Sequence, residues 1–184
     1  MIIMINGAFG VGKSSVAEKL MEKMNNTMLY DPEEVGFLLR TILPLDIRLK
    51  ESEEGDFQDF ILWRKTVVDL GKSLKNTYQR DLIIPMAICK PEYLEYIFEG
   101  FKELDEDTFH FCLTASKETI YRRLHERGDE EGDWSFQQTE KCLRAYEEYD
   151  FSEYIDAESS SADELAGILE EKINDRLMKN STDL

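Results

Sequence analysis

Residues 7–14, GAFGVGKS, combine glycines, a lysine and a hydroxyl in the spacing G-x-x-x-x-G-K-S. In this pattern the glycines let the backbone wrap around a phosphate, and N–H groups at the start of the following helix point at it. The lysine reaches the β- and γ-phosphates of a nucleotide and the hydroxyl binds Mg²⁺. We therefore expect Lys13 to be catalytic and Ser14 to be a metal ligand. The expected nucleotide-binding residues are Gly7, Ala8, Phe9, Gly10, Val11, Gly12, Lys13, Ser14 and Ser15.

Three further charged side chains lie where they could meet a ligand. Asp31 follows an apolar run and precedes Pro-Glu-Glu, so it lies at the rim of a sheet, where ligands bind, and is also a good helix N-cap. Arg123 and Arg127 are four residues apart and share one flank of a helix. The alternative for this pair is a solvated face, on which the arginines pair with Glu126 and Glu130.

Two arginines and two tryptophans allow both a functional and a structural interpretation. Arg64 falls inside the apolar stripe of its helix, and a buried guanidinium needs either an internal carboxylate or the substrate as its partner. Arg40 lies on the same side of its helix as Phe37, which makes either a substrate-facing pair or a solvated arginine. Trp63 and Trp134 either stack on a flat ring of a ligand or are buried.

The elements that must position these residues alternate between strand and helix. The apolar runs have no period-two alternation, which is typical of parallel strands covered on both faces. Repeated β-α units of this kind predict an α/β fold, a three-layer α/β/α sandwich around a five-stranded, mainly parallel sheet. The strands are expected at residues 2–5, 28–30, 82–88, 109–113 and 154–155.

Helices and loops fill the intervening segments of one domain, residues 1–184. Capping signals place helix starts at Asp31, Pro91 and Ser116. Two acidic segments with glycines are expected to be loops over a site, at residues 50–56 and 128–133. Apolar residues at helical spacing predict further helices at residues 14–25, 57–78 and 162–177.

Charge and cysteine content exclude several classes of site and partner. Lys and Arg number 22 and Asp and Glu number 39, so the net charge is −17. A surface this acidic repels nucleic acid and anionic membranes, so neither is expected as a partner. The three cysteines are widely spaced, which favours free thiols in a reducing cytoplasm over a zinc site. The apolar stretch at residues 1–5 is too short for a signal peptide or a membrane span.

Four segments extend the pattern beyond the first loop: YDPEEVGFLLRTILP, LWR, LIIPMAICKPEY and LTASKETIYRRLHERG. In this order, and together with INGAFGVGKS, they closely resemble the tunicamycin-resistance ATP-binding protein family. That family belongs to the P-loop kinase-like NTPases, near the gluconate kinase and chloramphenicol phosphotransferase types. The resemblance runs from Met1 to about Ile173. An N-K-x-D guanine signature is absent from the sequence, which argues against a GTPase.

The resemblance implies a nucleoside-kinase-like fold with a lid at about residues 117–140 and substrate-side helices at about residues 32–80. It implies that Asp31 is the general base for the acceptor hydroxyl or a contact of Mg²⁺. It also implies that Arg123 and Arg127 are catalytic lid arginines, which neutralise the transferring phosphoryl group or stack on adenine. The residues expected to bind the substrate are Asp31, Phe37, Arg40 and Arg64.

One feature departs from many P-loop enzymes. These often end the third strand with an acid that helps to hold Mg²⁺, whereas the expected third strand here ends in apolar residues and Asp81 precedes it. Mg²⁺ would then rest on Ser14, phosphate oxygens, water and Asp31. The departure weakens the case for turnover and leaves the nucleotide site intact.

The resemblance favours a cytoplasmic, ATP- and Mg²⁺-dependent kinase that phosphorylates a hydroxyl of a small molecule such as tunicamycin. The alternatives are an ATP-dependent protein that sequesters the drug without turnover, and a nucleoside or nucleotide kinase. Stable membrane insertion of the last helix is not expected, because acidic residues outnumber basic ones along it. No oligomeric state is predicted.

Overall fold

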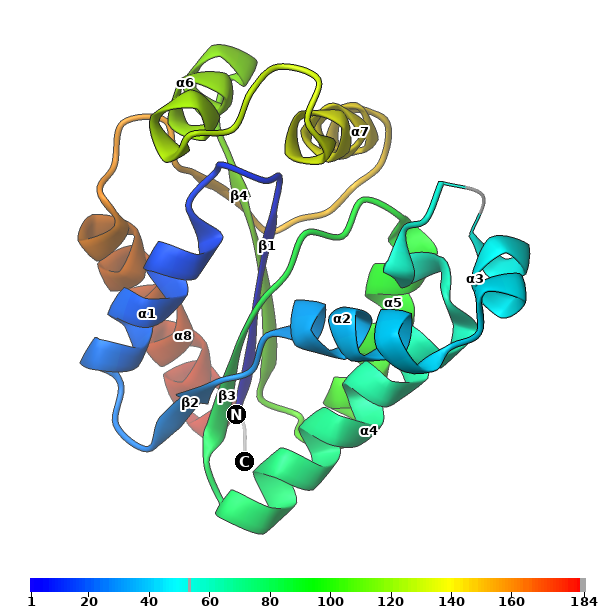
Figure 1. Cartoon of the computed structure of the whole chain (residues 1–184). Helices are drawn as coiled ribbons and strands as arrows, with labels where there is room; N and C mark the ends of the chain where they lie inside the picture. The colour runs from blue at the N-terminus through cyan, green and yellow to red at the C-terminus, as the bar shows by residue number, and fades with distance from the viewer. Residues whose placement is uncertain (53, 183–184) are drawn as a thin grey trace.

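A five-stranded sheet runs through the centre of the computed structural model, which describes residues 1–52 and 54–182 (Figure 1). Each pair of neighbouring strands is parallel, in the order β2-β3-β1-β4-β5. The strands are β1 (Ile2–Gly7), β2 (Thr27–Leu29), β3 (Asp81–Pro85), β4 (Thr108–Thr114) and β5 (Tyr154–Asp156). The predicted α/β fold with a five-stranded parallel sheet is therefore confirmed.

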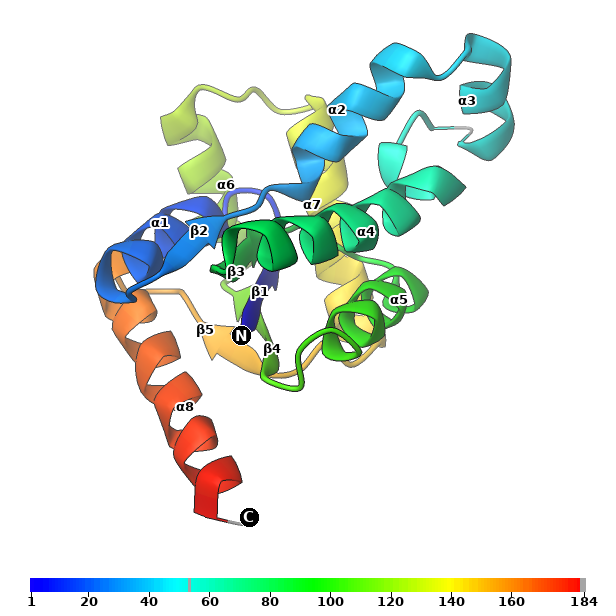
Figure 2. The ribbon, with the colours of Figure 1, turned by 90° about the horizontal axis from the view of Figure 1, so that it is seen from below.

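Helices cover both faces of the sheet (Figure 2). On one face lie α1 (Lys13–Lys23) and α8 (Ala162–Thr182), and on the other lie α4 (Ile61–Tyr78) and α5 (Pro91–Lys102). Successive side chains of a strand point to opposite faces. Ile3 and Ile5 therefore join the core under α1 and α8, while Ile2 and Met4 join the core under α4 and α5.

The remaining helices gather at the carboxyl ends of the strands. After β2 come α2 (Pro32–Ile42), α3 (Leu45–Glu51) and a 3-10 turn, η1 (Phe57–Asp59). Between β4 and β5 lie α6 (Lys117–Arg127) and α7 (Trp134–Glu148), which stand above the end of β1 in Figure 1. The topology thus brings the loop after β1, the start of α2 and the α6–α7 pair to one edge of the sheet. Among the described residues, no helix is long and apolar enough to cross a membrane.

Helix starts follow their capping residues. The side chain of Asp31 accepts a hydrogen bond from the backbone N–H of Glu33, and Ser116 accepts one from Thr119. Pro91 is the first residue of α5. These are the three starts that the capping signals predict. The predicted loop at residues 128–133 separates α6 from α7, whereas α3 occupies the start of the other predicted loop, up to Glu51.

Most predicted bounds differ from the structure by one or more residues, and two of the differences have a clear physical cause. β3 ends at Pro85 rather than at residue 88, because the side chain of Asn6 replaces the sheet ladder there. Its amide donates to Ile88 O at 3.1 Å and its carbonyl oxygen accepts from Ile88 N at 2.8 Å. The helix predicted at residues 57–78 is interrupted at Phe60, whose extended backbone (φ −63°, ψ 123°) separates η1 from α4. Asp81, predicted to precede the third strand, is its first residue.

A histidine lies in the core without a full set of partners. His110 is in β4, its Nδ1 lies 3.3 Å from Ser152 O, and no described atom pairs with its buried Nε2. Burial lowers the pKa of His110 from 6.5 to about 4. The unfolded chain binds this proton more readily, so the free energy of unfolding falls as the pH drops from 6.5 toward about 4.

Replacing the imidazole of His110 with a ring that cannot titrate should reduce the dependence of the unfolding free energy on pH. We expect His110→Phe to remove about 3 kcal/mol of the loss in unfolding free energy between pH 7 and pH 4. Urea denaturation across this range measures it. His125→Phe is the matched control, since the side chain of His125 is 48% exposed. If the unfolding free energy of His110→Phe depends on pH as steeply as that of the wild type, the buried imidazole is not the cause of this dependence.

Candidate functional site

The backbone conformation of the loop between β1 and α1 depends on glycines. Gly12 has a φ of 108° and caps the start of α1 in a left-handed conformation. Gly10 has a φ of 80°, and a Cβ on it would lie 2.8 Å from Leu124 Cγ of α6. Glycine is therefore required both for the turn itself and for the close approach of α6 to the loop.

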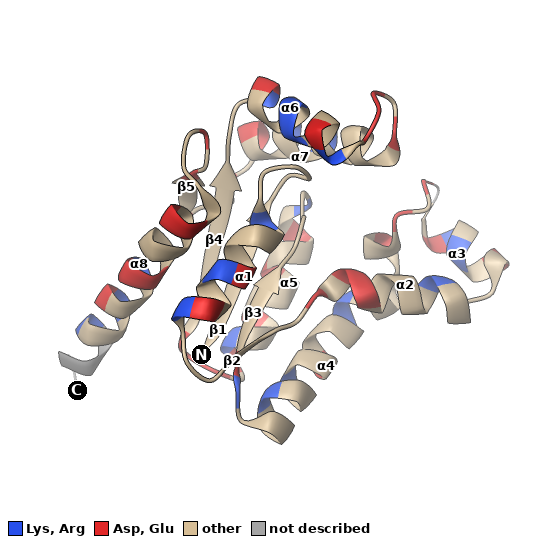
Figure 3. Ribbon diagram, turned by 60° about the vertical axis from the view of Figure 1, so that its left-hand side comes forward, with Lys and Arg blue, Asp and Glu red and all other residues tan. Residues whose placement is uncertain are grey.

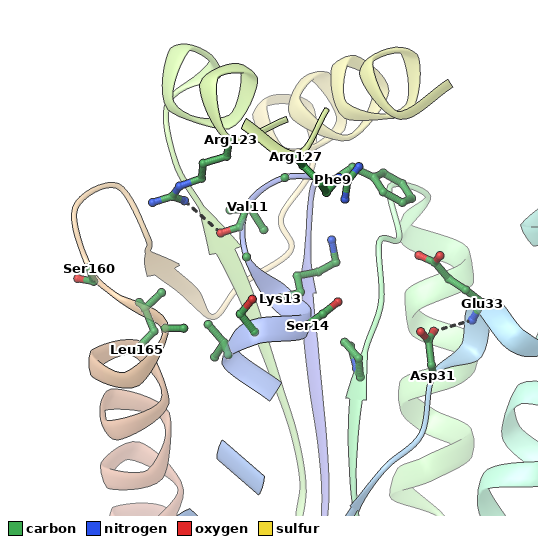
Figure 4. Close-up of a pocket in the computed structure, with 16 residues that line it drawn as sticks. Phe9, Val11, Lys13, Ser14, Asp31, Glu33, Arg123, Arg127, Ser160 and Leu165 are labelled. Atoms are coloured by element: carbon green, nitrogen blue, oxygen red, sulfur yellow. Dashed lines mark hydrogen bonds between the residues drawn. The ribbon is translucent and has the colours of Figure 1, made fainter. Parts of the chain in front are cut away.

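A cavity of about 560 Å³ opens above this loop. The loop and the start of α1 form one wall, while the start of α2, the arginines of α6 and the start of α8 form the others (Figure 4). Of the predicted nucleotide-binding residues, it is lined by Phe9, Gly10, Val11, Gly12, Lys13, Ser14 and Ser15. Gly7, the last residue of β1, and Ala8, the first residue of the loop, are buried and do not line it.

Lys13 is a buried cation at the base of the cavity. Its Nζ donates to Ala8 O at 2.8 Å and lies 5.2 Å from the ring centroid of Phe9. Burial lowers the pKa of Lys13, so the ammonium is held at an energetic cost. No carboxylate among residues 1–52 and 54–182 is paired with it. A phosphate in the cavity would supply the missing negative charge.

The first turn of α1 adds its own donors to the cavity. Ser14 and Ser15 line it, and no side chain caps this helix end. Free N–H groups and the positive end of the helix dipole favour an anion at this place. Figure 4 shows Ser14 beside Lys13 at the start of α1. A hydroxyl there could serve as the Mg²⁺ ligand that the sequence predicts, and this role remains a prediction.

Arg123 connects the loop to the other wall of the cavity. Its guanidinium donates to Val11 O at 3.2 Å, to Ala157 O at 2.9 Å and to Glu158 O at 3.3 Å. Glu158 in turn accepts from Ser116 Oγ at 2.9 Å, at the start of α6. Neither of the partners proposed from sequence, Glu126 and Glu130, contacts Arg123. It therefore holds three segments together, and its predicted catalytic role remains a prediction.

Arg127, the second predicted lid arginine, has fewer hydrogen-bond partners than Arg123. Its Nε donates to Asp129 Oδ2 at 2.6 Å, while the other oxygen of Asp129 accepts from Ser135 at 2.8 Å. The partner is thus Asp129 rather than Glu126 or Glu130. Arg127 lines the cavity with Lys13, and the charge of Arg127 acts to lower the pKa of both Lys13 and Glu33.

Two carboxylates from the start of α2 line the same cavity, and only Asp31 was predicted. Asp31 is exposed and accepts from Glu33 N at 2.8 Å, so it is an N-cap that also borders the cavity. Glu33 is half-buried, and burial, followed by repulsion from Asp31, raises its pKa. The signal for Glu33 was present in the sequence, because it lies two residues beyond Asp31 at the same rim.

The other predicted substrate-binding residues lie away from this cavity. Arg40 donates to Gly55 O at 2.7 Å and lies 4.9 Å from the ring centroid of Phe57, on which Phe37 also packs edge-on. Arg64 donates to Gln58 O at 3.2 Å, and its guanidinium carbon lies 4.1 Å from the Tyr93 ring centroid. Arg64 thus pairs with a backbone carbonyl and a ring, not with an internal carboxylate. The substrate roles of Phe37, Arg40 and Arg64 remain predictions.

The two tryptophans have different environments. Trp63 is buried and its indole N–H donates to Pro32 O at 3.0 Å, so it belongs to the core beneath α2. Trp134 is 40% exposed at the start of α7, with its ring centroid 5.1 Å from that of Phe9. Trp134 therefore extends the edge of the nucleotide loop toward α7, where an exposed ring face could meet a ligand.

The donor set suits Mg²⁺ bound through a nucleotide. Ser14, Asp31 and Glu33 supply hard oxygen ligands around the cavity. The end of β3 contributes Pro85 but no acid, as predicted, and Asp81 lies at the opposite end of that strand, 2.9 Å from Lys75 Nζ. In the part of the chain that the structure describes, no group of three His, Cys, Asp or Glu side chains could hold a metal ion by itself. A metal here would depend on phosphate and water for its remaining ligands.

Sequence and structure comparisons give the family. The profile of the AAA domain family matches residues 3–159. No curated protein sequence matches this chain.

Solved structures match nearly the whole chain. The tunicamycin resistance protein of Deinococcus radiodurans has 26% identity and a TM-score of 0.73, over 96% of this chain and 94% of that chain. A gluconokinase of Sinorhizobium meliloti has 18% identity and a TM-score of 0.66, over 98% of this chain and 94% of that chain. A shikimate kinase of Bacteroides thetaiotaomicron has 16% identity and a TM-score of 0.62, over 95% and 98%. The two kinases share the fold; the chain itself belongs to the AAA domain family and resembles the tunicamycin resistance protein along almost its entire length.

Proposed function

We propose that this protein is an ATP- and Mg²⁺-dependent phosphotransferase that transfers the γ-phosphoryl group to a hydroxyl of a small molecule. The observation that carries the proposal is the convergence of Lys13, Arg127 and two carboxylates on one cavity of about 560 Å³. Cations on one side would stabilise the phosphoryl group, and carboxylates on the other would meet the acceptor.

Each side chain has a distinct task in such a reaction. Lys13 and the N–H groups of the loop bind the β- and γ-phosphates, and Ser14 with a carboxylate of α2 holds Mg²⁺. Mg²⁺ held there would neutralise part of the charge on the phosphates. Arg127 leaves Asp129 to contact the γ-phosphate, as part of a lid formed by α6 and α7. Asp31 or its neighbour Glu33 takes up the proton of the acceptor.

The acceptor lies on the α2 side of the cavity in this proposal. The similarity to the tunicamycin resistance protein of Deinococcus radiodurans makes tunicamycin the first acceptor to test. Phe37, Arg40 and Arg64 belong to the helices of this side and would contact the acceptor farther from the γ-phosphate.

A second candidate is an ATP-dependent binder that sequesters the drug without turnover. The missing acid at the end of β3 favours it, because Mg²⁺ then has fewer protein ligands. Nucleoside or nucleotide kinase activity is the third candidate, and it differs from the first only in the acceptor.

Incubation of the purified protein with Mg²⁺-ATP and tunicamycin tests the first two candidates against each other. The proposal predicts drug-dependent ADP release and an acceptor heavier by one phosphoryl group in mass spectrometry. Tight drug binding with neither event favours the binder. A panel of uridine, thymidylate, gluconate and shikimate in the same assay tests the third candidate.

The buried lysine of the loop gives a sharper test. Lys13→Ala should weaken Mg²⁺-ATP binding or transfer at least about 100-fold, because one preorganised charge on the phosphates is lost. Isothermal titration and the transfer assay measure these quantities. Lys19→Ala is the matched control, since Lys19 lies on the same helix and pairs with Glu22 at the surface. If Lys13→Ala retains both ATP affinity and transfer, the role assigned to the loop is incorrect.

The lid arginine should act on turnover more than on binding. Arg127→Ala should lower kcat by about 10²–10³-fold with a smaller change in ATP affinity, because its contact forms on the transferring group. Arg122→Ala is the control, since Arg122 is 62% exposed on the same helix. An equal loss in both arginine variants would contradict a lid role for Arg127.

A further inference from the structure

We infer that Cys89 and Cys142 form a redox-sensitive thiol pair, which a peroxide converts to a disulfide that ties α7 to the segment between β3 and α5. The inference goes beyond the proposed function, and the thiol pair itself does not depend on that function. Cys89, Cys112 and Cys142 are all free thiols in the structure, as the sequence predicts. The contact between two of them is a property of the fold that the sequence does not reveal.

Cys89 and Cys142 meet although they are far apart in the sequence. Cys89 follows β3, whereas Cys142 lies in α7. A hydrogen bond joins the two thiols, and Cys89 packs against the core cluster to which Cys142 belongs. Cys89 also lines a cavity of about 470 Å³ together with Gln138 and Lys141 of α7. Because Gln138 and Cys142 are four residues apart on one helix, they share the face of α7 that is turned toward Cys89.

Hydrogen bonds fix this face of α7 on both sides of Cys142. The hydroxyl of Tyr146 donates to Ile88 O at 3.1 Å, in the segment that follows β3. The hydroxyl of Thr139 donates to Phe9 O at 3.1 Å, in the loop that follows β1. The two thiols are therefore held together by contacts that do not involve sulfur, and no large movement of the backbone is needed to join them.

The two thiols differ in access and in acidity. Cys89 is half-buried and lines the cavity, so a small oxidant can reach it, whereas Cys142 is 1% exposed. The hydrogen bond from Cys142 lowers the pKa of Cys89, although burial and the charge of Asp56 oppose this effect. The nearby Lys90 and Lys141 also act to lower it. Cys89 is therefore the thiol that reacts first, and Cys142 is the one that resolves the product.

Cys112 serves as a comparison within the same chain. It lies in β4 and is fully buried. Burial raises the pKa of the Cys112 thiol to about 12. A buried, neutral thiol of this kind is inert, so Cys112 is expected to stay reduced.

The oxidation balances with hydrogen peroxide as the two-electron oxidant. The sulfur of Cys89 attacks one peroxide oxygen and the O–O bond breaks, which gives a sulfenic acid and one water. The sulfur of Cys142 then attacks the sulfenic sulfur, so that the S–S bond forms and the S–O bond breaks. The leaving hydroxide takes the proton of Cys142 and becomes a second water. A thiol reductant reverses the reaction by exchange.

The disulfide would restrain the helices that stand above the loop after β1. Since α7 is joined to α6, which carries Arg123 and Arg127, a covalent link from α7 to the segment after β3 limits the movement of both helices away from the sheet. In the proposed phosphotransferase α6 and α7 are the lid, and slower lid opening lowers turnover. This effect on turnover is the one consequence that rests on the proposed function.

Peroxide treatment of the purified full chain tests the pair without an assay of activity. After unfolding of the treated protein, we expect one thiol that can be alkylated and a mass lower by two hydrogen atoms. A digest should contain a peptide that links Cys89 to Cys142. Dithiothreitol should restore all three free thiols.

Alanine variants separate the roles of the cysteines, and mapping of the wild type stands even where a variant fails to fold. Cys142→Ala should stop at a sulfenic acid on Cys89, which dimedone labels. Cys89→Ala should react with peroxide at least about tenfold more slowly than the wild type, because its remaining thiols are buried. Cys112→Ala is the matched control and should form the disulfide at the wild-type rate.

Hydrogen exchange measures what the disulfide does to α7. Amide exchange in α7 should slow by at least about tenfold on oxidation of the wild type, and it should not change in peroxide-treated Cys142→Ala. Where the wild type phosphorylates one of the acceptors above, kcat should fall on oxidation and recover with dithiothreitol. A wild type that phosphorylates none of them removes the proposed function, and the mapping and exchange measurements still decide the inference.

Several results would overturn the inference. The pair is wrong if three thiols and no sulfenic acid remain after peroxide treatment, if the disulfide includes Cys112, or if it links two copies of the chain. Equal reaction rates of Cys89→Ala and Cys112→Ala would contradict Cys89 as the reactive thiol. Exchange in α7, or kcat of an active enzyme, that the disulfide leaves unchanged would contradict the restraint.

Discussion

A lysine ammonium buried without a carboxylate is the constraint on which the rest of this structure depends. Among the described residues, Lys13 Nζ donates to a backbone carbonyl and lies over the ring of Phe9, and burial opposes its charge. A buried ammonium needs hydrogen-bond acceptors or an anion around it. The buried β1 strand delivers the loop, glycines at positive φ fold it, and Arg123 secures it from two other segments. The fold thus holds in place the loop that we propose binds a phosphate.

The surrounding charge makes this place selective. The chain carries a net charge of −17, and Figure 3 shows acidic residues along α8, at the start of α2 and among the basic residues of α6. A surface of this charge disfavours polyanions. In the function proposed above, a nucleotide enters the cavity toward Lys13, Arg127 and the first turn of α1, and the acids at the start of α2 face the acceptor.

The fold and the conformation of the glycine-rich loop could be predicted from the sequence, because both depend on local patterns. Uniformly apolar runs predict buried parallel strands, and the spacing of the glycines predicts the conformation of the loop. The predicted bounds that were wrong depend on tertiary contacts. The side chain of Asn6 ends β3 early, and Phe60, whose ring is buried, interrupts a predicted helix. Arg64 shows the same limit, since the ring of Tyr93 that accommodates it lies 29 positions later in the sequence, on α5. Glu33 was missed because a capping pattern accounts for Asp-Pro-Glu without any role for the last residue.

A crystal structure with Mg²⁺ and a non-hydrolysable ATP analogue tests the central claim most directly. The account predicts β- and γ-phosphate oxygens within hydrogen-bond distance of Lys13 Nζ and of the loop N–H groups. It also predicts Mg²⁺ on Ser14 Oγ and Arg127 turned from Asp129 toward the γ-phosphate. A nucleotide bound outside this cavity, or its absence from crystals grown at saturating analogue, would contradict the account.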